Sequence, residues 1–165
     1  MIKSVLAILT LFLFSCTIKY NPVLTGKENK RLDGFNLLMG DSTIIDTSKI
    51  KNNSPFIVIY FSPQCPYCKL ETEDILQNIS KIDQGNIFMI TSFSLDQMKK
   101  FYKAYKIEKF KQISMGVDYK NIFYNTYKPS GLPFTLFFNK DKILKKAFIG
   151  TLEIDSIINF MHTDK

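Results

Sequence analysis

Cys65 and Cys68, two cysteines separated by two residues, are the side chains of this sequence best suited to chemistry. A thiolate can attack a disulfide sulfur, and a second thiol close by can displace the mixed disulfide that forms. A C-x-x-C pair can also supply two ligands to a soft metal ion. The surrounding elements decide between these two chemistries.

The residues around the pair predict that it lies at the start of a helix. The run 56–61 is continuously apolar and rich in β-branched and aromatic side chains, which predicts a central strand buried on both faces. After it, Cys65 falls at the expected N-cap, Pro66 at the first helical position and Cys68 one turn further. The positive end of the helix dipole would then favour the thiolate of Cys65, and Cys68 would be the buried resolving thiol.

The sequence lacks the further ligands that a structural zinc site normally has, since such sites usually take four. His162 is the only histidine, and we expect it near the C-terminus of the last helix rather than on a metal. We therefore expect no metal site and no other cofactor. A metal-delivery module, similar to the copper chaperones, stays open as the alternative function.

Along the rest of the chain, apolar patterns typical of strands alternate with patterns typical of helices. Period-two or continuous apolar runs predict a hairpin from 35–39 and 43–45, and strands at 86–91, 113–117, 134–138 and 143–149. Helical patterns follow Cys65 up to Gly85, begin at a Ser94 capping box, run briefly over 121–127, and begin again at a Thr151 cap. This order predicts an α/β sandwich with a mixed central sheet flanked by helices.

The N-terminus has the pattern of an exported protein. A short basic start and the apolar run 5–14 predict a signal peptide over 1–15, because the run is too short to span a bilayer. Ser15 and Cys16 resemble the lipobox of bacterial lipoproteins, so we expect a lipid on Cys16 that anchors the protein to a membrane. Residues 16–31 read as a tether, and 32–165 as one domain.

Composition limits the partners further. The 165-residue chain has one-domain length and a net charge of +7, with its lysines dispersed among acids and with no block of like charge. We interpret this as a solvated surface and expect no nucleic-acid partner.

The chain resembles the thioredoxin superfamily in three features. These are the buried strand 56–61, the C-P-Y-C motif with Pro66 and Tyr67 that follows it, and Gly131-Leu132-Pro133 before a late strand. The unit between the two motifs is similar to the inserted helix-strand unit of its exported TlpA- and ResA-like branch. This resemblance implies that Pro133 is cis and faces the dithiol. A glutamate three residues after the second cysteine is common in that branch, and Glu71 occupies the position.

Two interpretations of Glu71 remain open from the sequence. One helical turn separates it from Cys68, so it could take the proton of that thiol; it could equally be a solvated acid in a charged first turn. The superfamily's peroxidases carry a threonine three residues before the nucleophile, where this chain has Ser62. The resemblance therefore implies a thiol-disulfide oxidoreductase outside the cytoplasm that exchanges electrons between a membrane thiol donor and protein thiols or disulfides.

Overall fold

The computed structural model describes residues 21–49, 54–82 and 86–163 of the chain. Cys16, the signal region and Gly85 lie outside these residues. The strands are β1 (Asn21–Pro22), β2 (Asn36–Met39), β3 (Ile44–Asp46), β4 (Phe56–Tyr60), β5 (Asn86–Thr91), β6 (Ile113–Val117), β7 (Phe134–Phe138) and β8 (Leu144–Ile149). The α-helices are α1 (Pro66–Gln77), α2 (Leu95–Ala104), α3 (Ile122–Tyr127) and α4 (Ile154–Thr163).

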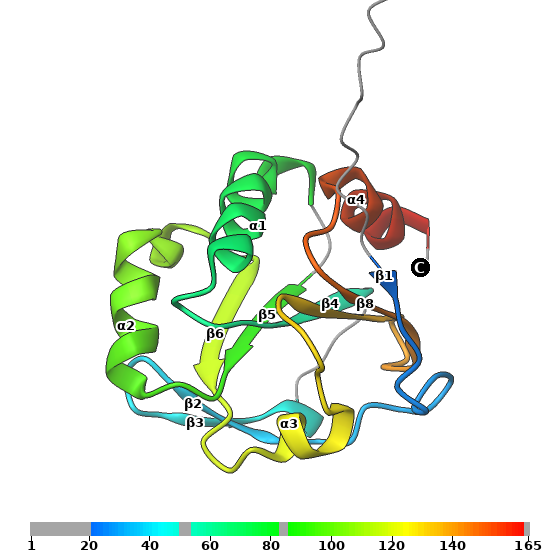
Figure 1. The fold of residues 1–165 in the computed structure, drawn as a ribbon, viewed down its shortest axis with the longest axis horizontal. Helices are drawn as coiled ribbons and strands as arrows, with labels where there is room; N and C mark the ends of the chain where they lie inside the picture. Colours follow the sequence, from blue (N-terminus) through cyan, green and yellow to red (C-terminus); the bar gives the residue numbers. More distant parts are fainter. Residues whose placement is uncertain (1–20, 50–53, 83–85, 164–165) are drawn as a thin grey trace, which may run out of the picture.

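The strands form one mixed sheet in the order β1-β8-β7-β4-β5-β6-β2-β3 (Figure 1). Strands β4, β5 and β6 are parallel, and all other neighbours are antiparallel. The carboxyl ends of β4, β5 and β6 therefore share one edge, and the loop that leads from β4 to α1 starts there. This edge of the sheet positions the C-x-x-C motif.

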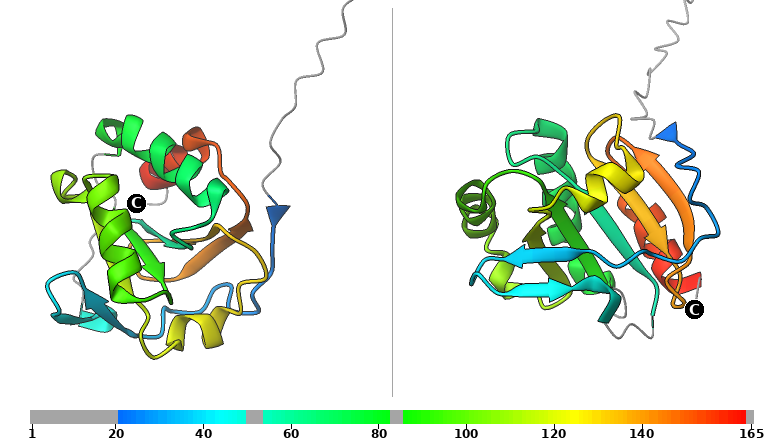
Figure 2. Two further views of the ribbon diagram at one scale, coloured as in Figure 1. Left: turned by 60° about the vertical axis from the view of Figure 1, so that its left-hand side comes forward. Right: turned by 90° about the horizontal axis from the view of Figure 1, so that it is seen from below.

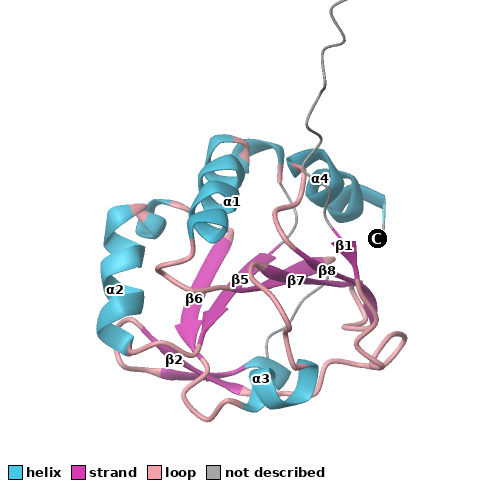
Figure 3. Ribbon diagram, viewed as in Figure 1, coloured by secondary structure: helices cyan, strands magenta, loops and turns pink. Residues whose placement is uncertain are grey.

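Side chains of the central strand point alternately to two different apolar cores, as the period of a β-strand requires. Ile57 and Ile59 belong to a core that also contains side chains of α1, α2 and α4. Phe56, Val58 and Tyr60 belong to the second core, which α3 covers. The sheet thus lies between three helices and α3, as Figure 3 and the view from below in Figure 2 show. The expected α/β fold with helices on both faces is confirmed.

Most of the expected elements are present at their expected places, including the N-terminal hairpin β2–β3 and the inserted helix-strand unit α2–β6. The Ser94 capping box is formed, because Ser94 Oγ accepts from Gln97 N–H and Gln97 Oε1 from Ser94 N–H.

Two expectations about helices are wrong. Helix α1 ends at Gln77 and is followed by a separate 3₁₀ turn, Ile79–Lys81, so the apolar pattern toward Gly85 continues past the helix end. Helix α4 begins at Ile154, three residues after the predicted cap Thr151, whose buried hydroxyl has no hydrogen-bond partner among the described residues. The segment around Thr151 instead serves the site, as shown below.

The prediction of a tether over residues 16–31 is wrong for 21–31. Strand β1 pairs with β8, Val23 N–H donates to Ala147 O (2.9 Å), and Arg31 forms a bridge with Ile143. This segment caps the edge of the sheet that β8 would otherwise leave exposed. Its polar composition hid the pairing, because backbone hydrogen bonds need no apolar pattern.

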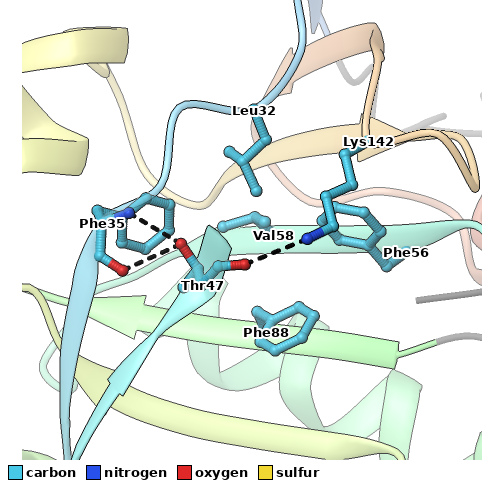
Figure 4. Close-up of a pocket in the computed structure, with 7 residues that line it drawn as sticks. All are labelled: Leu32, Phe35, Thr47, Phe56, Val58, Phe88 and Lys142. Carbon is cyan, nitrogen blue, oxygen red and sulfur yellow. Dashed lines mark hydrogen bonds between the residues drawn. The ribbon is translucent and has the colours of Figure 1, made fainter. Parts of the chain in front are cut away.

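A buried lysine fastens the N-terminal hairpin to the far end of the sheet (Figure 4). Lys142 is only 9% exposed, and its Nζ donates to Ser48 O (2.9 Å) and more weakly to Thr47 O (3.5 Å). Thr47 Oγ1 in turn accepts from Phe35 N–H and donates to Phe35 O. The space between these residues measures about 10 Å³, which is room for one water and no ligand.

Candidate dithiol site

Cys65 is the N-cap of α1, and its sulfur takes the place of the usual capping oxygen. The backbone of Cys65 is extended (φ −68°, ψ 120°), Pro66 follows at the start of the helix, and Cys68 N–H donates to Cys65 Sγ (3.3 Å). This amide is one of those that a helix start leaves without an intrahelical partner. The geometry that the sequence predicted for the first turn is therefore present.

The two thiols differ in their access to solvent. Cys65 is half-buried, whereas Cys68 is 2% exposed, and the two are not joined by a disulfide. Burial raises the pKa of the Cys68 thiol, with smaller contributions from its contact with Cys65 and from the charge of Glu71. Cys65 is thus the thiol that a large partner can reach, and Cys68 is held as a protonated thiol beneath it.

Pro133 lies beside the nucleophile's position in the cis form that the resemblance implied. The Leu132–Pro133 bond is cis, and the Leu132 carbonyl accepts from the Cys65 thiol across 3.9 Å. Gly131 allows this loop to run close to β8, because a Cβ there would lie 2.7 Å from Ile149 Cγ2. The loop therefore forms one wall of the site.

Glu71 lies one turn after Cys68 and is buried, with 2% of its surface exposed. Burial raises the pKa of its carboxyl to about 8, and the hydrogen bond from Leu152 N–H to Oε1 (3.1 Å) acts in the opposite direction. The interpretation of Glu71 as a solvated acid is wrong. A carboxyl group with this pKa exchanges its proton near neutral pH.

Sequence reasoning missed the segment that holds Glu71 and Pro133 together. Gly150 N–H donates to Pro133 O (2.9 Å), and two residues later Leu152 N–H donates to Glu71. Both contacts use backbone groups of residues distant in sequence, so no side-chain motif indicates them. The loop from β8 to α4 thus connects the cis-proline loop to the buried carboxyl.

The remaining motif residues lie at the surface. Tyr67 is 60% exposed on the first turn of α1, and Leu70 on the same helix is also exposed. His162, in the last turn of α4, hydrogen-bonds to the Lys81 carbonyl (3.2 Å). In the described part of the chain, no three His, Cys, Asp or Glu side chains are grouped as metal ligands.

The fold and the dithiol at a helix start define this chain as a thioredoxin-fold protein. The sequence profile of the Thioredoxin-like domain family matches residues 45–158, and the chain belongs to this family. No curated protein sequence matches the chain.

Three similar solved structures have a low sequence identity and nearly the same fold. A secreted Mycobacterium tuberculosis disulfide oxidoreductase homologous to E. coli DsbE is 15% identical, with 77% of this chain and 93% of that chain covered and a TM-score of 0.63. The exposed lipoprotein thioredoxin Etrx1 of Streptococcus pneumoniae is 20% identical, with coverages of 78% and 98% and a TM-score of 0.64. The peroxidoxin BcpB of M. tuberculosis is 13% identical, with coverages of 84% and 98% and a TM-score of 0.66. Since these names include different activities, the site has to indicate the function.

Proposed function

We propose that this chain is a thiol-disulfide oxidoreductase that works outside the cytoplasm through Cys65 and Cys68. The observation that carries the proposal is the pairing of a half-exposed thiol at a helix start with a buried thiol one turn further. Thiol exchange needs this division, because one sulfur must meet the partner and the other must wait beneath it.

The exchange proceeds in two balanced steps. The Cys65 thiolate attacks one sulfur of a client disulfide; the client's S–S bond breaks, and its second sulfur leaves as a thiolate that takes a proton from water. Cys68 then loses its proton and attacks the Cys65 sulfur, which releases the client as a dithiol and leaves a Cys65–Cys68 disulfide. A dithiol donor reverses these steps, so the same site can run in either direction.

In this proposal Glu71 accepts the proton that Cys68 loses. The two residues are buried together, one turn apart on α1, and burial raises the pKa of both. Proton transfer between them avoids moving a charge through the apolar core. The loop of Leu132 and Pro133 would hold the client's backbone beside Cys65, because the Leu132 carbonyl already lies next to the Cys65 sulfur.

We further propose that a lipid on Cys16 holds the domain at the outer side of a membrane of the bacterial cell envelope. The lipobox-like Ser15-Cys16 supports this, as do two structurally similar proteins, one secreted and one an exposed lipoprotein. No helix within the described ranges is long and apolar enough to cross a membrane. The partners would be extracytoplasmic protein thiols or disulfides and a membrane donor of the thiol-transfer type.

Trapping of the mixed disulfide tests the roles of the two thiols. Cys68→Ser leaves the first step intact and blocks the second, so it should accumulate covalent complexes with client proteins. These complexes should appear on non-reducing gels and disappear with dithiothreitol.

Cys65→Ser is the matched control and should accumulate almost no complexes. Complexes that form through Cys68 in the Cys65→Ser variant would contradict the assigned roles. An absence of complexes in both variants, together with no disulfide reduction by the unmodified chain, would contradict the proposed function.

A further inference from the structure

A groove opens directly beside the expected nucleophile, between helices α1 and α2. Pro63 and Gln64, the two residues that precede Cys65, form its upper end, and Lys69, Lys100 and Tyr105 are among its walls. The groove measures about 540 Å³, within the roughly 300–1,000 Å³ of typical ligand clefts. Because Pro63 and Gln64 directly precede Cys65 in the chain, this end of the groove is next to the dithiol site.

The floor of the groove is apolar and fixed in place. Phe101 is buried and contacts Phe61 (ring centroids 4.9 Å apart) and Tyr105 (4.5 Å apart). Tyr105 OH donates to Glu73 Oε1 (3.3 Å), so this wall residue is tied to α1 by a hydrogen bond. A polypeptide that entered would therefore meet a preformed surface.

The end of the groove near Cys65 carries positive charge without a partner. Lys69 and Lys100 are exposed, and the single ion pair among the residues that the structure describes is Lys49–Asp46, on the distant hairpin. Asp96, one turn before Lys100 on α2, forms no ion pair with it. The groove thus has one lysine on each of its two helices and an apolar floor between them. Such a groove could bind an extended client segment that carries a carboxylate.

The spacing between the groove and the thiol fixes where that carboxylate should be. Lys69 N–H donates to Cys65 O (3.2 Å), so Lys69 lies one helical turn, about 5.4 Å, below the nucleophile. An extended peptide advances about 3.3 Å per residue. This distance corresponds to one or two residues, and only side chains two residues apart lie on the same face of an extended peptide. The carboxylate should therefore follow or precede the client cysteine by two residues.

We infer that Lys69 and Lys100 form a specificity subsite for client segments that carry Glu or Asp two residues from the reacting cysteine. This inference rests on the proposed function. In this proposal the groove between α1 and α2 recognises the client segment, and the dithiol carries out the exchange.

The test uses three peptides that differ at one position, with Glu, Gln or Lys two residues from a cysteine activated as a mixed disulfide with thionitrobenzoate. Cys65 attacks the peptide sulfur, the bond to thionitrobenzoate breaks, and the coloured thiolate that leaves reports the rate. At low salt the Glu peptide should react about three- to tenfold faster than the Lys peptide, with Gln between them, since each exposed ion pair contributes little. The difference should vanish near 1 M salt, where charges are screened within about 3 Å.

A K69E/K100E double variant should reverse this order of peptides. The control K145E/K146E changes the net charge by the same amount. Both of its lysines are exposed near the start of β8. The cis-proline loop lies at the other end of that strand, where Ile149 pairs with Phe134. The control should keep the wild-type order. Alkylation of each variant by uncharged iodoacetamide measures its thiol reactivity, and dividing every peptide rate by this alkylation rate separates recognition from reactivity.

Equal rates for the three peptides, or a reversed order in K145E/K146E as well, would overturn the subsite. Thionitrobenzoate release that is the same in Cys65→Ser would instead overturn the proposed function. The two failures are therefore distinguishable.

Discussion

Glu71 differs from its neighbours on α1 because its carboxyl is enclosed while theirs are not. Glu73 is solvent-exposed and receives a hydrogen bond from a tyrosine, whereas Glu71 is buried and receives one from a backbone amide. Burial raises the pKa of Glu71 to about 8. At neutral pH a sizeable fraction of this carboxyl is protonated, so its capacity to accept a proton should grow as the pH rises toward 8.

At the scale of the residue, Glu71→Gln should slow the resolving step around 10²-fold near neutral pH, the loss typical of a missing general base. The wild-type rate of mixed-disulfide resolution should rise with pH and level off near pH 8, and the Gln variant should lose this component. Stopped-flow measurement of client release from a preformed mixed disulfide checks both expectations. The same rate and pH profile in the two proteins would show that Glu71 has no part in the step.

Stability gives an independent check of the same protonation. The folded-state pKa of about 8 lies above the ordinary 4.5, so between these values the unfolded chain loses the proton first. Wild-type stability should then fall as pH rises from about 4.5 to 8, by on the order of a few kcal/mol, while Glu71→Gln should show a flatter profile. Urea unfolding at several pH values measures the difference.

Sequence predicted the two cysteines and the cis-proline of the candidate site better than their surroundings. Cys65, Cys68 and Pro133 stand in short motifs, and local rules place the first two in one helical turn. Neither the burial of Glu71 nor the amide of Leu152 follows from local rules, since the contact joins positions 81 residues apart. For this reason the sequence left two interpretations of Glu71 open.

At the scale of the element, strands were easier to predict than ends of helices and edges of the sheet. Strands β5, β6 and β7 have the expected bounds because each is rich in apolar residues and is followed by polar ones. The pairing of β1 and the burial of Lys142 could not be predicted, because polar residues carry them. Lys142 stands in a turn whose polar composition indicates exposure.

The hairpin β2–β3 should depend on Lys142. Lys142→Ala leaves the carbonyls of Thr47 and Ser48 without this donor, which should cost about 1–3 kcal/mol of unfolding free energy. Lys140→Ala, in the same turn but exposed, is the control and should change stability by less than about 0.5 kcal/mol. Urea denaturation compares the two variants; equal stabilities would mean that the ammonium contributes nothing there.

At the scale of the whole molecule, the proposed lipid anchor on Cys16 would determine where the domain can act. Cys16→Ser should prevent lipid attachment, and the protein should leave the detergent phase in Triton X-114 partitioning and lack the mass of the lipid in mass spectrometry. Thiol exchange by the purified variant should be unchanged, because the dithiol site lies wholly within residues 65–152. A Cys16→Ser protein with the same mass and the same partitioning as the wild type would contradict lipidation.

Because strand β1 pairs with β8, the linker between such an anchor and the folded domain is very short. Between Cys16 and Asn21, where the sheet begins, there are five Cα-to-Cα steps, which span at most about 18 Å when extended. A tether that ended at residue 31 would have allowed about three times that distance. A domain held by the shorter linker would stay close to the bilayer. Its donor and its clients would therefore have to bring their sulfur atoms to the membrane surface.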